Sequence, residues 1–432
     1  MPTRPSPGEP SLEDAEDALV DGDRTFAPGT ARAALANPTF RKVYFGAFAS
    51  NIGTWMQNVV LAALAYDLTG SSVFVGIITF AQLGPLLLLS VVGGALADLI
   101  DRRRLLIIVA FEQLAFSLIL ALLVRPEEPP KVALVAVVFA IGAGQAVFAP
   151  TYTAMLPSLV GRENLSGAIA LNSAQMNGSR VIGPAIGGIA FAAVGASWVF
   201  AGNALTYLFI VGAMLAVRLP ETAYPAPGGQ GWRRLASGFG IARRDQVVRR
   251  CLITISTFSL FSLVFVTQLA VLAADNLGIS PRSSAYGALY ACFGLGAVAG
   301  ALSIGTVFAS RSKPAIVRAG LIAFAATLTA FAVLRQPAPA FPVAVLVGFC
   351  YFATTTSLST VLQEQLDEAV RGRVMALWIM GFGGIVPIGS LLAGPVIDAT
   401  SITTVVLFGA ACALGLSFYA RVDEPDVALR AG

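Results

Sequence analysis

The chain contains 432 residues, of which 56% are hydrophobic and only 12% are charged, and its mean hydropathy is +0.78. Soluble domains carry about 25% charged residues, so this composition excludes a soluble protein and indicates one embedded in a membrane. The formal net charge of +4 does not predict a nucleic-acid partner, because the arginines gather in short segments between apolar runs, which sets the orientation of membrane helices.

The first 36 residues form the most polar stretch of the chain. They combine seven acidic side chains with scattered proline and glycine, and they lack the apolar core of a signal peptide. We expect residues 1–36 to form a disordered cytoplasmic tail.

The chain has no histidine, and its four cysteines stand inside apolar runs without a pairing pattern. We therefore expect no disulfide, no metal site and no cofactor. No phosphate-binding loop, zinc spacing or nucleophile arrangement is visible, so the sequence does not predict an enzyme.

Apolar runs repeatedly reach the roughly 20 residues that a helix needs to cross a bilayer. We predict an all-α membrane protein with twelve transmembrane helices, at 43–66, 73–97, 104–124, 132–155, 166–193, 196–217, 251–274, 283–308, 314–334, 341–365, 372–397 and 402–421.

The segment from Gly93 to Arg104 fixes the predicted orientation. It places two carboxylates and three arginines between two apolar runs, so it must be a short loop outside the hydrocarbon. The loops on the same side carry most of the basic loop residues, whereas the opposite loops carry only Arg125, Lys131, Arg282 and Arg335. Positive loops face the cytoplasm, so we expect a multi-pass protein of the inner membrane with both termini cytoplasmic.

A Pro- and Gly-rich stretch at 218–250 separates the sixth predicted helix from the seventh. A repeat supports a duplication, because Ile182-Gly183 and Gly188 recur at the same spacing as Ile388-Gly389 and Gly394. We predict two pseudo-symmetric six-helix bundles in a monomer. The predicted parts are a tail at 1–36, a first bundle at 37–217, a cytoplasmic linker at 218–250, a second bundle at 251–421 and a tail at 422–432.

Three passages resemble the major facilitator superfamily, and within it the branch of enterobactin exporters and macrolide efflux proteins. The resemblance covers nearly the whole chain from Asn37 onward. The passages are the first helix with its flanks (Asn37–Arg41, Gly53–Gln57 and Tyr66–Ser71), the loop Gly94-x-Leu96-Ala97-Asp98 with Arg102-Arg103, and Gly178-x4-Gly183-Pro184-x2-Gly187-Gly188. The last is similar to the fifth-helix motif of antiporters.

This resemblance implies the major facilitator fold and a secondary active transporter. It implies export of a small molecule, such as a siderophore, a macrolide or another amphipathic compound, by alternating access with a proton as the coupling ion. Two departures concern coupling and the loop: the fourth helix lacks the arginine that many proton-coupled relatives carry near 141–145, and Leu99 and Asp101 replace the usual basic residue and glycine.

The loop between the second and third helices makes physical sense as a cytoplasmic latch. A carboxylate at Asp98 would be stabilised by the unpaired N–H groups and the dipole at the start of the eleventh helix. The alternative is that these charges only anchor the topology. The predicted latch residues are Gly94, Asp98, Arg102, Arg103, Arg371 and Arg373.

The fifth helix carries small residues and one charge. Gly178, Gly183, Gly187 and Gly188 let another backbone approach, which equally suits close packing or a sliding interface, and Pro184 bends the helix. Arg180 stands near mid-membrane, where a charge is costly unless a wet cavity or a carboxylate accommodates it. We favour a cavity over a direct pair with Glu112.

Polar residues on the presumed central helices predict the rest of a substrate cavity, although each alone is as consistent with contacts between helices. The cavity candidates are Asn51, Thr54, Gln57, Asn58, Gln145, Asn177, Arg180, Gln268, Tyr351, Thr354 and Thr355. The candidates for proton coupling are Glu112, Asp67 and Arg180.

Two alternatives to an exporter remain at this point. Import of a sugar or another nutrient would need the same helices and cavity. A membrane sensor or scaffold that transports nothing would explain the helices but neither the repeat nor the fifth-helix glycines.

Overall fold

The computed structural model of the chain describes residues 27–217 and 231–421. Apart from two five-residue π-helices, every regular element in these residues is an α-helix. The first part comprises α2 (Ala31–Ala36), α3 (Pro38–Thr69), α4 (Ser72–Leu99), α5 (Arg102–Leu123), α6 (Lys131–Val160), α7 (Leu165–Val194) and α8 (Ala196–Leu215).

The second part begins with α9 (Gly231–Arg244), which is followed by two interrupted helices and four continuous ones. They are α10 (Gln246–Thr257), η1 (Phe258–Ser262), α11 (Val264–Thr267), α12 (Leu269–Leu277), α13 (Ser284–Gly305), α14 (Lys313–Val333), α15 (Pro337–Glu364), α16 (Glu368–Ile379), η2 (Met380–Gly384), α17 (Val386–Ala399) and α18 (Ile402–Tyr419).

Local sequence signals set several helix boundaries. The side chain of Asn37 accepts hydrogen bonds from the amides at the start of α3, and Pro38 occupies the first helical position. Gly70 ends α3 in the left-handed conformation that glycine adopts at least cost. Asp101 accepts from the amide of Arg104 at 2.8 Å and so begins α5.

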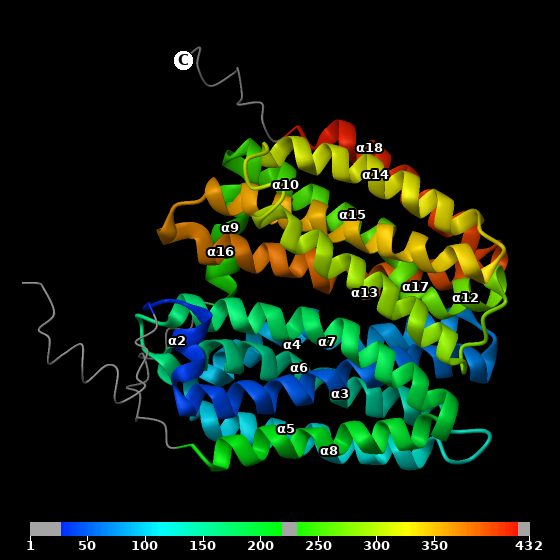
Figure 1. The fold of residues 1–432 in the computed structure, drawn as a ribbon, viewed down its shortest axis with the longest axis horizontal. Helices are drawn as coiled ribbons and strands as arrows, with labels where there is room; N and C mark the ends of the chain where they lie inside the picture. Colours follow the sequence, from blue (N-terminus) through cyan, green and yellow to red (C-terminus); the bar gives the residue numbers. More distant parts are fainter. Residues whose placement is uncertain (1–26, 218–230, 422–432) are drawn as a thin grey trace, which may run out of the picture.

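The helices form two groups, with α3–α8 in one and α10–α18 in the other, as Figure 1 shows. We call them the first and the second bundle. They meet where α7 packs against α13 and where α4 packs against α17. The chain is an integral membrane protein that crosses the bilayer repeatedly, and nine helical spans in the described residues are long and apolar enough to do so.

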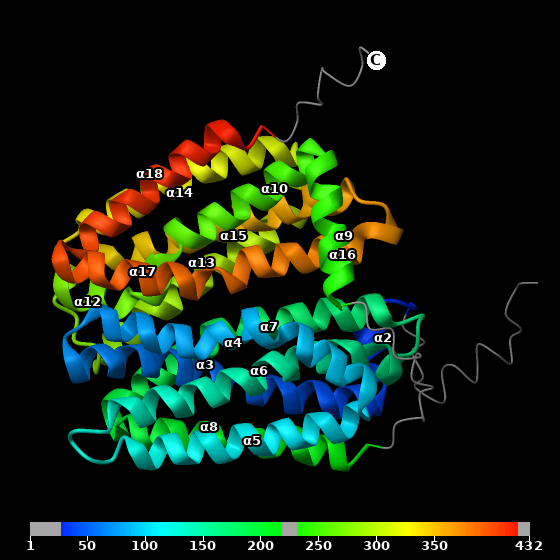
Figure 2. The same cartoon turned by 180° about the vertical axis from the view of Figure 1, so that it is seen from behind.

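The bundles have two distinct ends, which we name after the helices found there. The α2 end carries α2, the last turns of α4 and α6, and α9, which runs across the other helices in Figure 2. The α12 end carries the last turn of α3, the first turn of α4, and α12.

Each of the twelve predicted ranges overlaps a helix in the structure, while the number of membrane crossings stays a prediction. The seventh and eleventh predicted ranges each correspond to a helix that is interrupted by a five-residue π-helix. These two π-helical turns, η1 and η2, contact each other: the hydroxyl of Ser259 donates to the carbonyl of Phe382 at 3.0 Å. A π-helical turn interrupts the regular hydrogen bonds of a helix, so a backbone carbonyl there can accept from a side chain of a neighbouring helix.

The predicted tails and linker overlap the described residues only in part. Residues 1–26, 218–230 and 422–432 lie outside the described residues. Disorder at residues 27–36 was predicted wrongly, because α2 forms there with Thr30 as its cap, and Asn164 accepts from the amide of Gly29 at 3.1 Å. The described part of the predicted linker forms α9 and the start of α10.

Glycines allow the two bundles to touch near the α12 end. The backbones of Gly188 in α7 and Gly287 in α13 are so close that a Cβ on either would overlap the other. Gly76 in α4 approaches the carbonyl of Ser390 in α17 in the same way, and Gly394 approaches Val73. These approaches position both bundles around the site described next.

The same helices separate towards the α2 end. In α7, Pro184 and Gly188 face α13 and are buried, whereas Ser173 and Ala170 continue that stripe and are exposed. In α13, Gly287 and Gly294 are buried against α7, whereas Gly305, five turns after Gly287 on the same face, is exposed and has no neighbour within 4 Å of a Cβ position. The facing surfaces of α7 and α13 are therefore closed at the α12 end and open at the α2 end, where α9 contacts both α16 and α4.

Candidate functional site

Arg180 lies halfway along α7, between the two bundles. Its guanidinium carbon is 5.2 Å from the ring centroid of Trp55 in α3 and 5.5 Å from that of Phe352 in α15. It therefore contacts an aromatic ring from each bundle, which stabilises a desolvated guanidinium. Its Nε atom is buried and has no hydrogen-bond partner among the described residues.

Aromatic rings of the second bundle extend this site. Tyr351 stacks on Phe293 and Phe382 with ring centroids 6.0 Å and 6.3 Å apart, and it contacts Phe352 edge-on. Tyr351 and Tyr290 also lie close enough to Arg180 to interact with its charge. The site thus offers one cation in an aromatic surround, which suits a ligand with both an anionic or electron-rich group and an apolar body.

Glu112 occupies a separate polar network inside the first bundle. Its carboxylate accepts from the Gln113 amide at 2.8 Å, and Gln113 also donates to the carbonyl of Ile141 at 2.7 Å. The Tyr207 hydroxyl donates to Gln113 at 3.2 Å and is bonded to the Thr54 hydroxyl at 3.0 Å. No ion pair joins Glu112 to Arg180 in the described residues.

Several predicted cavity residues are engaged inside the first bundle. Gln57 is 1% exposed and accepts from Asn203 at 2.9 Å, and Asn58 accepts from Gln82 in α4. Asn51 is half-buried on α3, and Gln145 of α6 lies beside Tyr207. Asn177, close to Arg180 on α7, donates to the carbonyl of Ser173 at 3.0 Å.

The predicted cavity residues of the second bundle divide in the same way. Tyr351 belongs to the Arg180 site, but Thr354 is 1% exposed, contacts Gly320 and donates to its own helix. Thr355 is also buried and donates within α15. Gln268 lies at the α12 end, where it donates to the carbonyl of Ser72 across the bundles at 3.2 Å.

Polar contacts between the bundles gather at the α12 end. Asp67 of α3 forms an ion pair with Arg282 at 2.6 Å, and the hydroxyl of Tyr66 donates to Asp275 of α12 at 2.5 Å. Asp67, predicted as a coupling residue, is thus part of this contact. Sequence alone gives no signal for pairs this far apart in the chain.

Asp398 of α17 makes a further contact at the α12 end. Its carboxylate accepts from the amide of Ser72 and from the hydroxyl of Ser71, both at 2.8 Å. Ser71 itself provides no side-chain cap to α4. The first turn of α4 in one bundle is therefore capped by a residue of the other, where the helix dipole also favours a carboxylate.

The predicted latch is described only in part. The surroundings of Gly94 and the side chain of Asp98 are not among the described parts of the chain. Arg102 donates to the carbonyl of Ala154 at 2.8 Å, and Arg103 donates to that of Met214 in the last turn of α8 at 2.7 Å.

The two latch arginines predicted in the second bundle, Arg371 and Arg373, lie in the first two turns of α16. Arg371 donates to the carbonyl of Leu366 at 3.3 Å, and the carbonyl of Arg373 lies against Gly238 of α9. These contacts place both residues at the α2 end and leave the pairing with Asp98 a prediction.

The fifth-helix motif serves two neighbours of α7. Gly183 and Gly187 lie against the backbone of α3 within the first bundle, whereas Pro184 and Gly188 face α13 of the second. Gly178 is different, because a Cβ there would meet only the ring of Phe48 at an ordinary 3.6 Å.

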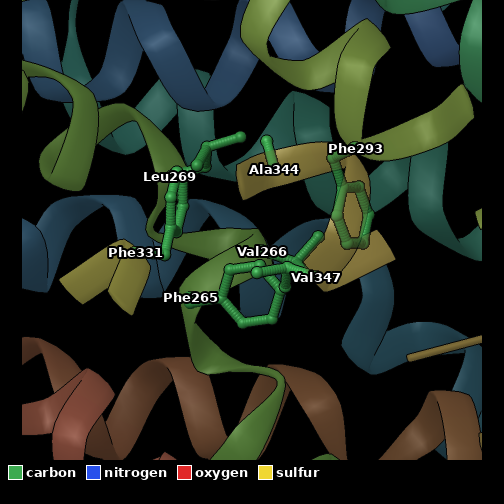
Figure 3. A pocket seen from close by; sticks show the side chains of 7 residues that line it. All are labelled: Phe265, Val266, Leu269, Phe293, Phe331, Ala344 and Val347. Carbon is green, nitrogen blue, oxygen red and sulfur yellow. The ribbon is translucent and has the colours of Figure 1, made fainter. Parts of the chain in front are cut away.

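Two apolar spaces lie away from these polar groups. Figure 3 shows the first, a packing gap inside the second bundle between Phe265, Phe293 and Phe331, which has no room for a water molecule. The second is a groove of about 350 Å³ between η1, α17 and α18, lined by residues such as Phe261 and Phe408. Neither contains a predicted site residue.

Sequence reasoning missed Trp55, Phe352, Gln113 and Tyr207. Gln113 and Tyr207 carried a usable signal, because each is a polar group inside an apolar run and must find a partner there. Trp55 and Phe352 carried none, since an aromatic residue in a membrane helix is ordinary.

The chain matches one known family over almost its whole length. The family model described as "Transmembrane secretion effector" matches residues 29–425. The "Enterobactin exporter EntS" of Escherichia coli O1:K1 / APEC is 29% identical over 359 residues, which cover 79% of this chain and 81% of that protein. The protein of the same name from Shigella boydii serotype 4 (strain Sb227) is 28% identical over the same length.

Solved structures share the fold at low sequence identity. The nucleoside transporter NupG has a TM-score of 0.73 at 12% identity and covers 90% of this chain and 100% of its own. A peptide transporter POT has a TM-score of 0.70 at 15% identity and covers 91% and 94%. Since the family match extends from the residues before α2 to those after α18, this chain belongs to the transmembrane secretion effector family within the major facilitator superfamily of transporters.

Proposed function

We propose that this protein exports an amphipathic small molecule through the inner membrane by alternating access, as a monomer driven by proton antiport. The similarity to enterobactin exporters supports export and makes enterobactin the first substrate to test. The observation that carries the proposal is Arg180, a charge halfway along α7 that contacts an aromatic ring from each bundle. Such a residue is positioned to sense a ligand between the bundles.

The asymmetry between the two ends supports alternating access. Ion pairs and hydrogen bonds join the bundles at the α12 end, while facing residues of α7 and α13 are exposed towards the α2 end. If the α2 end is cytoplasmic, as the arginine distribution predicts, this conformation receives substrate from the cytoplasm. Release to the other side then requires the contacts at the α12 end to break.

The strength of those contacts suits a reversible gate. An exposed ion pair such as Asp67 with Arg282 contributes about 0–1 kcal/mol, and a carboxylate at a helix N-terminus contributes about 0.3–1 kcal/mol. Together these two amount to about 0.3–2 kcal/mol, which ligand and proton binding can overcome to shift a population between two states.

Transport by everted membrane vesicles tests this function. Vesicles that contain the protein should accumulate enterobactin, or erythromycin as a macrolide probe, when respiration acidifies their interior, and nigericin should abolish the accumulation. Vesicles with equal amounts of Arg180→Gln protein are the control. Accumulation only in right-side-out vesicles would establish import instead, and binding of the probe without movement in either orientation would favour a sensor.

A further inference from the structure

The structure separates the acidic groups that could couple transport to protons. Asp67 lies at the α12 end and is paired with Arg282, and Asp398 lies there as a cap of α4. Within residues 27–217 and 231–421, Glu112 is the acidic residue placed halfway along a membrane-spanning helix, α5. A carboxyl group at that depth is costly to keep charged, so its protonation depends strongly on access to water.

Glu112 has polar neighbours but no cation. Its half-buried side chain lies against the backbone of Gly144 in α6 and accepts from Gln113. The titratable group that faces it from α8 is Tyr207. Three helices pack against α5: α8 has no charged residue, α6 has Lys131 at its first position, and α4 has Asp98 next to its last position. The charge of Glu112 is therefore not fixed by an ion pair in the described residues.

A continuous series of contacts leads from this carboxylate to Arg180. Gln113 donates to Glu112 and accepts from Tyr207, whose hydroxyl is bonded to that of Thr54. Trp55, the next residue of α3, lies under the guanidinium of Arg180. One half-turn of α3 thus touches both the Glu112 network and the aromatic site.

Resting on the export function proposed above, we propose that Glu112 carries the coupling proton, and that Gln113, Tyr207 and the Thr54–Trp55 segment transmit its charge state to the Arg180 site. The carboxylate takes up one proton when the site opens to the acidic side and releases that proton to the cytoplasm when it opens inward. Gln113 and Tyr207 are positioning residues, because an amide holds the carboxylate but does not pass a proton along.

The physical basis is the hydrogen bond between Gln113 and Glu112. An ionised carboxylate accepts such a bond strongly and a protonated one weakly. Loss of the charge leaves the Gln113 amide held by the carbonyl of Ile141 alone. The amide can then turn about that bond, which moves the acceptor of the Tyr207 hydroxyl and changes the position of α3 beside Arg180. Substrate affinity and proton affinity are then reciprocal, with a coupling of about 5–150-fold.

Proteoliposomes test the coupling with enterobactin as the probe. Glu112→Gln should reduce accumulation driven by a pH gradient at least about tenfold, while exchange of labelled for unlabelled enterobactin without a gradient stays within about twofold of the native rate. Glu112→Asp should restore part of the gradient-driven accumulation. Glu364→Gln is the matched control, because it removes an exposed carboxylate at the α2 end. This variant should leave both rates unchanged.

A second measurement does not depend on the substrate. Infrared difference spectra between acidic and alkaline proteoliposomes should show a carboxylic acid band of Glu112 for the native protein and for Tyr207→Phe. The spectra of Glu112→Gln should lack this band. Tyr207→Phe should nonetheless lose the pH dependence of enterobactin affinity, which a purely structural role of Tyr207 would leave in place.

The outcomes separate this proposal from the export function. An unchanged infrared difference in Glu112→Gln, or full gradient-driven accumulation by that variant, overturns the role of Glu112. If the affinity of Tyr207→Phe for enterobactin still depends on pH, the route through Tyr207 is overturned. If native proteoliposomes move no enterobactin, the choice of substrate fails while the infrared difference still decides whether Glu112 binds the proton.

Discussion

The contacts of Arg180 depend on the shape of its side chain as well as on its charge. Its planar guanidinium lies between two aromatic rings, a geometry that a lysine ammonium does not reproduce even though it keeps the charge. Its Nε atom is buried without a hydrogen-bond partner in the described residues, so the rings rather than hydrogen bonds hold this side of the guanidinium. These two properties predict different results for the two simplest substitutions.

Arg180→Gln should lower enterobactin accumulation in everted vesicles at least about tenfold, because it removes a charge-assisted contact worth about 1.5–3 kcal/mol. Arg180→Lys should give an intermediate rate. Arg125→Gln, in the loop between α5 and α6, is the matched control and should export normally. Full export by Arg180→Gln at normal expression would remove Arg180 from the transport site.

Residues like Arg180 and Glu112 could be predicted because a charge inside an apolar run is costly and therefore conspicuous. Their surroundings could not be predicted. Trp55 and Phe352 reach Arg180 from different bundles, and nothing in either stretch indicates that contact. The cavity list stays a prediction, and several of its polar residues, such as Gln57 and Thr354, are hydrogen-bonded to another side chain or to the backbone inside a bundle.

At the scale of the elements, the contacts at the α12 end make a testable gate. Asp67→Arg and Arg282→Asp each place like charges together, so either variant should shift the population towards a conformation open at that end. The double variant restores an opposite-charge pair and should recover much of the native distribution. Spin labels at Glu128 and Ser280, in loops of the two bundles, should report longer distances in the single variants than in the double variant.

Identical distance distributions in all these variants would show that the pair is irrelevant to the conformation. The native protein with the same two labels is the reference. Because the side chain of Arg282 is 62% exposed and that of Asp67 is 22% exposed, the effect should also weaken at high salt.

The α7 glycines offer a comparison within one helix. Gly188→Ala should force α7 and α13 apart at the α12 end, because the added Cβ meets the backbone of Gly287, which has little room to move. Gly178→Ala adds the same atom where the nearest neighbour is 3.6 Å away, so it should leave the distance between the bundles unchanged and should not lower the unfolding temperature. The same spin-label pair, with a thermal unfolding measurement, distinguishes them. Equal behaviour of both variants would contradict the close approach.

The helices themselves could be predicted well, since length and hydropathy nearly determine an apolar spanning helix. The π-turns could not, because the contact that joins them, from the Ser259 hydroxyl in η1 to the Phe382 carbonyl in η2, links two stretches far apart in the sequence. α2 was missed because its stability comes from contacts with the start of α7, whereas its own sequence is short and polar at its flanks.

At the scale of the whole molecule, orientation is the prediction with the widest consequence. A variant without the four native cysteines should be labelled by a membrane-impermeant maleimide at Glu127→Cys in intact cells and at Glu364→Cys only in everted vesicles. Glu127 lies in the α5–α6 loop at the α12 end, and Glu364 is the last residue of α15 at the α2 end. Labelling of both from the same side would invalidate the cytoplasmic assignment of the α2 end.

The cap that Asp398 places on α4 bears on how the protein is made. Ser72 leaves the ribosome 326 residues before the carboxylate that accepts from its amide. For most of synthesis the free amides in the first turn of α4 must therefore be hydrogen-bonded by water at the membrane surface. The cap of α4 is completed only once α17 has been inserted. A nascent chain stopped before α17 would carry all of the first bundle yet lack a group that completes it.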